Sequence, residues 1–163
     1  MANVRRSNGF IYAQPLGCGG TGAAPIWHCK LRSNHIIRFG DVMRGSNGLA
    51  DMTNIATTDG IIGVSQYTNT TSTATNVSIT FIPAVPWVVF EAQSVAVGSI
   101  GQVFGAHRLA GATGAQRVSV GATTSMDTMR CIGLGTGDNT SIGVNREMLV
   151  VFQKSRLIGL GQD

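Results

Sequence analysis

No window of this 163-residue sequence repeats apolar residues at positions i, i+3, i+4 and i+7 between capping residues. Glycine instead recurs every few residues, 22 times in all, and β-branched residues dominate the stretches between the glycines. Because β-branched residues favour extended backbone and glycine favours turns, this pattern predicts short strands separated by turns. We therefore expect an all-β fold: a single β-barrel or sandwich, jelly-roll-like, with an extended N-terminal arm.

Nine segments have the composition of strands, and turn signals such as Ser46-Asn47-Gly48 and Asp59-Gly60 separate several of them. In the segment 86–93, Val88, Phe90 and Ala92 share the better core face, so Trp87 and Glu91 are expected to point outward together. The predicted strands span residues 9–14, 25–31, 35–44, 60–68, 76–82, 86–93, 116–121, 128–135 and 147–155.

The first part of the chain differs in character from the rest. Residues 1–34 hold two glycine-rich breaks and few core positions, which favours an N-terminal arm. Residues 35–163 carry most of the strand pattern and are predicted to form the β-barrel or sandwich domain.

Charged residues make up only 12% of the chain, about half the usual share. So few charges suggest that partners cover much of the surface. The net charge is +4, but the basic residues are scattered and aromatic residues make up 6%, which disfavours a nucleic-acid binding stripe.

Three cysteines without a framework spacing favour a reducing compartment, and no apolar run is long enough to predict a membrane helix. We expect a soluble, unprocessed chain.

One motif suggests chemistry at first sight. Residues 17–22 match G-x-G-x-x-G, but a dinucleotide loop must open a helix, and residues 23–34 carry no amphipathic helical face. The motif is therefore predicted to be a flexible turn in the arm. Neither the spacing of the acidic residues nor that of the serines and histidines indicates catalysis, so we expect no enzyme activity and no cofactor. No metal site is expected either, because the four candidate ligands lack the spacing of a zinc site. These residues are Cys18, His28, Cys29 and His35.

Several short segments follow one another in an informative order along residues 1–157. The chain opens with MANVRRSNGFIYAQPLGCGGTGAAPIWHCKL, continues with IIRFGDVMR, DGIIGVSQYT, VVFEAQ and SIGQVFGA, and closes with MRCIGLGTGDNTSIGVNREMLVVFQKSRL. In this order they resemble the minor capsid, or cement, proteins of tailed bacteriophages. That family often carries Asp-Asp-Pro shortly before its Phe-Glu, whereas residues 82–87 here keep the prolines and lack the acids. The departure puts in doubt any contact that those acids would make.

The resemblance implies a non-enzymatic protein that is made in the bacterial cytoplasm and binds the outside of a phage head. There it would bridge neighbouring major capsid subunits, as a homotrimer, and stabilise the shell against the pressure of packaged DNA. Neither a membrane nor a specific nucleic acid is implied as a partner. The residues expected to contact the capsid or a neighbouring subunit are Arg5, Arg6, Phe10, Ile11, Tyr12, Ile26, Trp27, Trp87 and Glu91.

The residues leave alternatives open. Phe10 and Tyr12 also suit a role in capping the domain's own core, and Arg5 and Arg6 also suit a solvated chain start. Trp87 and Glu91, which share a face, also suit an ordinary position on the surface of the barrel. The alternative functions are another phage structural β-module, such as a spike, fibre or shell component, and a small β-barrel binding module for carbohydrate or nucleic acid.

Overall fold

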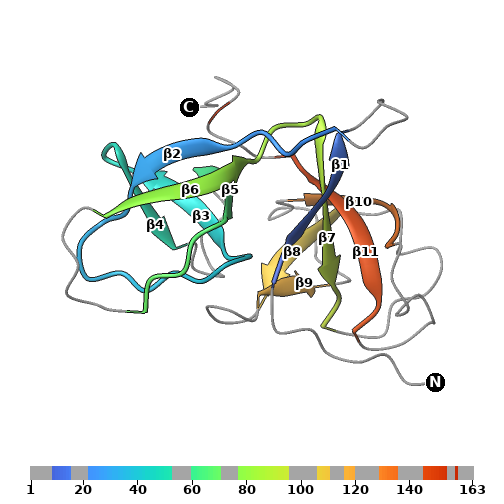
Figure 1. Cartoon of the computed structure of the whole chain (residues 1–163). Coiled ribbons are helices and arrows are strands. Elements are labelled where there is room, and N and C mark those ends of the chain that lie inside the picture. The colour runs from blue at the N-terminus through green and yellow to red at the C-terminus, as the bar shows by residue number, and fades with distance from the viewer. Residues whose placement is uncertain are drawn as a thin grey trace.

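The computed structural model of the chain is all-β, as expected, with eleven strands and no α-helix among the residues that it describes (Figure 1). The strands form two antiparallel sheets, one of six strands and one of five. The described residues are 9–15, 22–52, 60–70, 77–95, 106–110, 116–119, 129–135, 145–153 and 157.

The six-stranded sheet has the order β1-β7-β11-β10-β8-β9. In that order its strands are β1 (Ile11–Pro15), β7 (Val88–Gln93), β11 (Glu147–Phe152), β10 (Met129–Leu134), β8 (Ala106–Ala110) and β9 (Arg117–Ser119). The five-stranded sheet has the order β2-β6-β5-β3-β4. Its strands are β2 (Trp27–Lys30), β6 (Ser78–Pro83), β5 (Ile61–Ser65), β3 (Val42–Ser46) and β4 (Leu49–Met52).

Both sheets curve, but in neither do the described strands form a continuous hydrogen-bonded ladder that would close a barrel. A single parallel bridge between Ser94 and Val118 joins the end of β7 to β9, and another between Leu31 and Ala50 joins the chain after β2 to β4. The two expected forms were a barrel and a sandwich, and the arrangement of two packed sheets is sandwich-like.

The chain passes twice between the sheets at one edge. β1 pairs with β7 in the first sheet, and β2 pairs with β6 in the second. The connection that contains residues 22–26 and the connection 84–87 therefore both cross between the sheets at this place, which we call the corner (Figure 1). Because a strand that changes sheets must bend, the prolines at positions 25 and 86 suit the corner, where no ladder hydrogen bond is needed from them.

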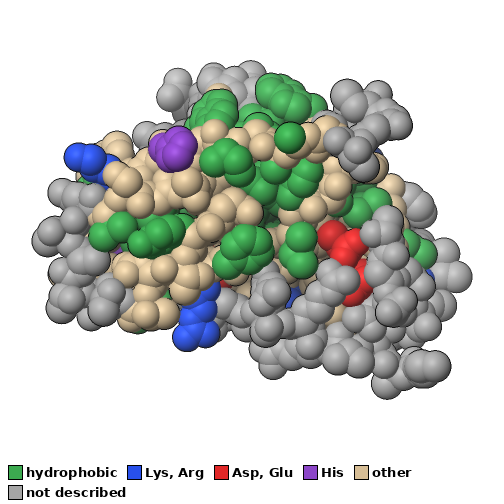
Figure 2. Space-filling view, in the orientation of Figure 1, with side chains coloured by type: hydrophobic (Ala, Val, Ile, Leu, Met, Phe, Trp, Pro, Cys, Tyr) green, Lys and Arg blue, Asp and Glu red, His purple; other side chains and the backbone are tan. Residues whose placement is uncertain are grey.

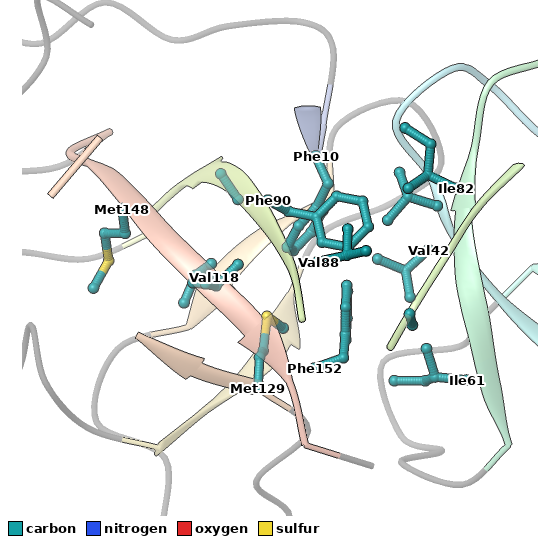
Figure 3. Packing of buried hydrophobic residues seen from close by; sticks show 14 of the residues in the cluster. Phe10, Val42, Ile61, Ile82, Val88, Phe90, Val118, Met129, Met148 and Phe152 are labelled. Carbon is teal, nitrogen blue, oxygen red and sulfur yellow. The ribbon is translucent and has the colours of Figure 1, made fainter. Parts of the chain in front are cut away.

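Apolar side chains fill the space between the two sheets. Figure 3 shows Val42 and Ile82 of the five-stranded sheet beside Phe90 of the other sheet. The ring of Phe152 lies 5.4 Å from that of Phe90 and 5.8 Å from that of Phe10, measured between centroids. Burial of each such side chain contributes roughly 1.5–3 kcal/mol, so this cluster is what joins the sheets.

A second apolar cluster lies on the other face of the five-stranded sheet. Its centre is formed by Met43 of β3 together with Ile79 and Phe81 of β6, and Leu31 and Ile37 cover them. This sheet is therefore buried on both faces, which explains why all five residues of β5 are buried. Within it, the turn Asn47-Gly48 adopts positive φ at both residues and joins β3 to β4 as a tight hairpin.

The segment 1–34, which the sequence groups as an arm, contributes the strands β1 and β2 to these sheets. Gly9 adopts a φ of 58°, and a Cβ at this position would collide with the carbonyl of Gly40. This close approach lets the Phe10 N–H donate to the Gly40 carbonyl at 2.9 Å. In the isolated chain, residues 9–15 and 22–34 therefore pack on their own domain. An extension toward a neighbour in an assembly stays a prediction.

Each of the nine predicted strands overlaps an observed one. Two observed strands were not predicted, and two details of the prediction are wrong. The sequence pattern missed β4 and β8, and most of the predicted strand 35–44 is an irregular loop that becomes β3 only at Val42. The core face of β7 is confirmed, because Val88, Phe90 and Ala92 enter the cluster between the sheets. Glu91 does not point outward into solvent, since Ile11 of β1 and Leu149 of β11 pair with it on either side.

Replacing Phe10 with alanine tests whether the N-terminal segment belongs to the core. Because the ring is fully buried between the sheets, Phe10→Ala should lower the free energy of unfolding by about 3–5 kcal/mol. Urea denaturation followed by circular dichroism measures this change. Trp87→Ala is the control, and its effect should stay within about 0.5 kcal/mol because its side chain is exposed. Equal effects of the two changes would mean that Phe10 does not support the core.

Candidate functional site

Three large apolar side chains are exposed at the corner. Ile26 is 47% exposed, Trp27 46% and Trp87 57%, and we call these three residues the corner patch. Figure 2 shows hydrophobic side chains gathered along the upper edge of the molecule, where β2 and the connection from β6 to β7 lie in Figure 1. Exposed aromatic residues of this size are typical of surfaces that bind a partner.

The corner patch is held on a firm support. Trp27 pairs with Phe81 across β2 and β6, and the two rings meet edge to face with centroids 6.3 Å apart. The Tyr12 hydroxyl donates to the carbonyl of Gly22 at 2.9 Å, which ties the start of the crossing segment to β1. Ala24 packs on the core from the same segment. Trp27 therefore needs little ordering before it binds a partner, which lowers the entropic cost of binding.

The predicted contact residues fall into different places in the structure. Ile26, Trp27 and Trp87 lie in or directly beside the two connections at the corner, whereas Phe10 is buried in the chain's own core. Ile11 and Tyr12 are half-buried on β1, and Glu91 is only 7% exposed. Two predicted residues, Arg5 and Arg6, lie outside the described residues, as does the motif 17–22 except for its last glycine.

A shallow pocket of about 270 Å³ lies beside β1. Residues of β1, including Ile11 and Gln14, line it together with Glu91 and Leu149. The Glu91 carboxylate also approaches Gly135, where a Cβ would lie 3.0 Å from Oε2. The pocket thus lies beside β1. Among the strands that the structure describes, β1 is at the edge of the six-stranded sheet.

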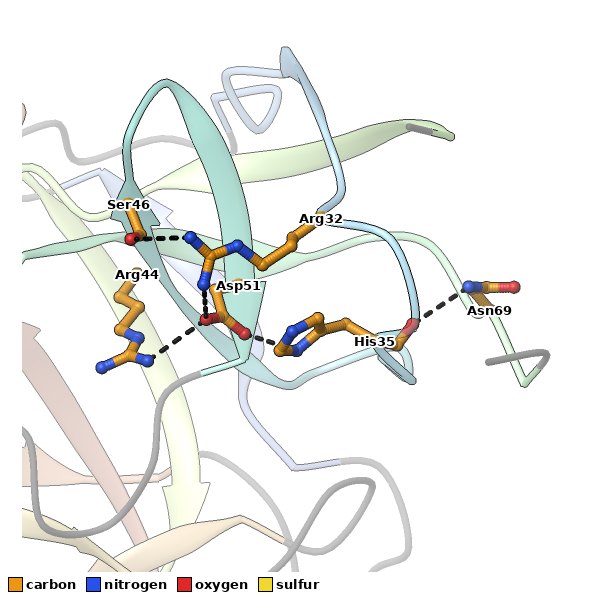
Figure 4. A network of polar contacts seen from close by, with 6 residues as sticks. All are labelled: Arg32, His35, Arg44, Ser46, Asp51 and Asn69. Atoms are coloured by element: carbon orange, nitrogen blue, oxygen red, sulfur yellow. Dashed lines mark hydrogen bonds and ion pairs between the residues drawn. The ribbon is translucent and has the colours of Figure 1, made fainter. Parts of the chain in front are cut away.

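A buried carboxylate organises a group of polar residues that the sequence analysis did not single out (Figure 4). The side chain of Asp51 is 3% exposed, and its Oδ1 accepts from His35 Nδ1 at 2.6 Å. Arg44 Nη2 lies 3.1 Å and Arg32 Nη1 3.6 Å from the other oxygen, Oδ2. Arg32 Nη2 also donates to Ser46 Oγ at 3.4 Å. We call these five residues the Asp51 cluster.

The Asp51 cluster holds an exposed loop in place. His35 begins the segment 35–40, and its carbonyl accepts from Asn69 Nδ2 at 3.1 Å. Ile37 pairs with Asn69, and the Phe39 N–H donates to Thr68 Oγ1 at 3.1 Å. The exposed apolar side chains on these two paired segments, which we call the loop patch, are Ile36, Phe39 and Tyr67.

One signal in the sequence points toward the Asp51 cluster. In a chain with 12% charged residues, Arg32, Arg44 and Asp51 fall within twenty positions together with His35. The pairing of these residues depends on the hairpin β3–β4, in which Arg44 lies opposite Asp51. The pattern of residues 49–52 did not predict a strand. The contacts between the Asp51 carboxylate and its partners therefore could not be predicted from the sequence.

The described residues hold no group of three or more His, Cys, Asp or Glu side chains that fits a metal ion, and Cys18 lies outside them. No helix in this part of the chain is both long and apolar enough to span a membrane. Comparison with known protein families, curated proteins and solved structures finds no match to this chain.

Two cysteines are shielded from reaction. Burial raises the pKa of the Cys29 thiol to about 11 and that of the Cys131 thiol to about 11, from an ordinary value of 9.0. Because the thiolate is the reactive form, the raised pKa lowers its fraction at pH 8 by about a hundredfold. Both thiols therefore remain protonated at neutral pH.

Alkylation tests this shielding. In the native protein at pH 8, iodoacetamide should modify Cys29 and Cys131 far more slowly than in urea, and the native rate should rise steadily as the pH increases toward 11. Mass spectrometry of peptides after timed alkylation measures each site separately. A native rate that levels off near pH 9 would show that burial does not raise these pKa values.

Asp51→Asn tests the role of the carboxylate in the Asp51 cluster. The change preserves the shape of the side chain but removes the negative charge that offsets Arg32 and Arg44. Because these arginines are about one-third exposed, the loss should be about 2 kcal/mol of unfolding free energy, below the range for a fully buried pair. Urea denaturation measures it, with Arg130→Gln, on the exposed face of β10, as the control. A loss no greater than that of the control would contradict the assignment.

Proposed function

We propose that this chain is a capsid cement protein of a tailed bacteriophage. It binds the outer surface of the head and bridges neighbouring major capsid subunits, which stabilises the shell against the pressure of packaged DNA. The observation that carries the proposal is the corner patch, because its three exposed apolar side chains lie on paired strands and on a short turn. Tryptophan is among the residues that most often supply the binding energy of protein interfaces.

The order of sequence segments supports the same function. Segments that resemble phage cement proteins run along residues 1–157, and they include β1, β2 and β7, three of the four strands that flank the corner. The low charge of the chain also suits a surface that is largely covered in an assembly. In a homotrimer, three copies of the corner patch would contact the shell together.

The mechanism follows from linkage between contacts. A cement oligomer that contacts several capsid subunits must lose its contacts together before it dissociates, so its avidity exceeds the affinity of any single contact. Outward pressure separates capsid subunits, and the bound oligomer opposes that separation because it spans the boundary between them. This activity needs a rigid surface, and the proposal is supported by the paired strands that carry Trp27 at the corner.

Binding to emptied phage heads tests the proposal. The purified protein should bind expanded heads saturably, with a fixed number of copies per head, in a sedimentation assay. Trp87→Ala should weaken this binding by about 2 kcal/mol, roughly thirtyfold, because an exposed tryptophan is a typical centre of binding energy.

Leu134→Ala is the matched control, since this side chain is also exposed and lies at the end of β10, two strands away from β7 in the six-stranded sheet. It should change the affinity less than about threefold. If the wild-type protein sediments with the heads no more than an unrelated protein does, the cement function is wrong. Tight, salt-sensitive binding to DNA instead would favour the nucleic-acid binding module.

A further inference from the structure

Strand β2 lies at an edge of the five-stranded sheet, among the strands that the structure describes (Figure 1). In that order of strands it pairs with β6 alone. Just after β2 ends, the Leu31 N–H donates to the Val77 carbonyl at 2.8 Å. The next N–H, that of Arg32, donates at 2.8 Å to the carbonyl of Ala50 on the other side. Successive backbone groups along β2 therefore point alternately toward β6 and away from it.

This alternation decides which backbone groups of β2 face outward. Counting back from the outward N–H that follows the strand, the N–H and C=O groups of Lys30 and His28 point away from β6. In the parallel register of the bridge Leu31–Ala50, these two residues lie level with the start of β4 and the turn Asn47-Gly48, where the chain reverses. No described strand therefore lies beside them on that side. An unpaired edge of this kind is a template for a further strand.

The side chains of β2 differ between its two faces. Trp27 and Cys29 share one face, on which the ring of Trp27 meets the ring of Phe81. His28 and Lys30 share the other face, and both are exposed. Among the described residues, no ion pair includes Lys30. A strand that fits beside β2 therefore has apolar residues on one face and acidic residues on the other.

Charge decides between two occupants of this edge. A second copy of the chain can offer its own β2, but antiparallel pairing of the two strands then places Lys30 opposite His28 or opposite a second Lys30. Neither arrangement supplies a carboxylate, and like charges that lie directly opposite each other destabilise a sheet. A lysine on an edge strand opposes such pairing between copies. An acidic residue opposite Lys30 forms a favourable cross-strand pair instead.

We propose that the outer edge of β2 binds an extended segment of a partner protein as an added antiparallel strand. This segment carries an acidic residue opposite Lys30 and apolar residues on the face of Trp27. The added strand is antiparallel, as every ladder between described strands is. Backbone hydrogen bonds to His28 and Lys30 supply the affinity, and the side chains select the segment. The inference deepens the proposed function, because Trp27 belongs to the corner patch, and it rests on that function only for the identification of the partner as a capsid subunit.

Peptides with blocked backbone groups test strand addition on the full-length protein. The probe is a six-residue acetylated and amidated peptide that alternates valine and glutamate. In an antiparallel pair, the residue opposite Lys30 exchanges backbone hydrogen bonds with it, so the glutamate N–H groups face β2 and the valine N–H groups face away. Methylation of the glutamate nitrogens should weaken binding at least about tenfold, because about two hydrogen bonds are lost. Methylation of the valine nitrogens is the matched control and should preserve binding. Equal affinities of the two methylated peptides, measured by NMR titration, would overturn the proposal.

Amide hydrogen exchange locates the added strand. In the free protein the His28 and Lys30 amides should exchange fast because they face outward, whereas the Leu31 amide, bonded to Val77, should exchange slowly. A saturating concentration of the probe peptide should slow exchange at His28 and Lys30 by about tenfold and leave Leu31 unchanged. Unchanged rates at His28 and Lys30 would contradict the proposal. If both amides are protected in the free protein and the protection falls on dilution, a second copy occupies the edge and the proposal is wrong.

Two variants of equal charge change test the selection of an acidic segment. Lys30→Gln should weaken binding of the probe peptide by about threefold, the effect of one cross-strand ion pair. Arg130→Gln, at an exposed position of β10, should change it less than about twofold. Equal losses in both variants would refute the selection, and so would equal binding of a peptide with lysine in place of glutamate. Failure to bind phage heads would contradict the cement function alone, because these assays contain no heads.

Discussion

Phe10, Phe90 and Phe152 meet in the space between two sheets whose described strands share no ladder with each other. Because no backbone hydrogen bonds of a common sheet join the two halves, apolar burial in this cluster supplies the main attraction between them. Polar contacts add to it, since the buried side chain of Gln116 accepts from the Val42 N–H at 2.6 Å and the Gly40 carbonyl accepts from the Phe10 N–H at 2.9 Å. The positions of the corner and of both exposed patches depend on this packing.

The corner follows from the same arrangement. Strand pairs β1–β7 and β2–β6 belong to different sheets, so the chain must cross between the sheets twice at one edge. At such a bend the inner side chains, among them Ala24 and Val85, enter the core, and the outer side chains have no sheet to cover them. Ile26, Trp27 and Trp87 are therefore exposed on well-supported backbone. The loop patch is held in a comparable way, by the buried carboxylate of the Asp51 cluster and by the backbone pair Ile37–Asn69. The proposed function uses the corner patch.

Prediction from the sequence succeeded where the local pattern decides the structure. The alternation in 86–93 identified the core face of β7, and the turn at Ser46-Asn47-Gly48 is the hairpin between β3 and β4. It failed where neighbours decide the structure. Residues 35–41 have the composition of a strand, but the side chain of Asp51 and the backbone of Asn69 hold them as a loop. Glu91 alternates with core residues as a surface residue would, but the strands on either side of it remove it from solvent.

The sequence by itself determined the all-β class, most of the strands and the scarcity of charge, because these depend on residue type and spacing within one segment. Only the tertiary structure decided that Phe10 belongs to the core while Trp27 and Trp87 do not, although all three are aromatic residues in or beside predicted strands. It also brought Arg32, Arg44 and His35 to one buried carboxylate. The physical reason is the same in both cases. Burial and ion pairing depend on which strands lie side by side, and pairings between distant segments leave no periodic signal in either segment alone.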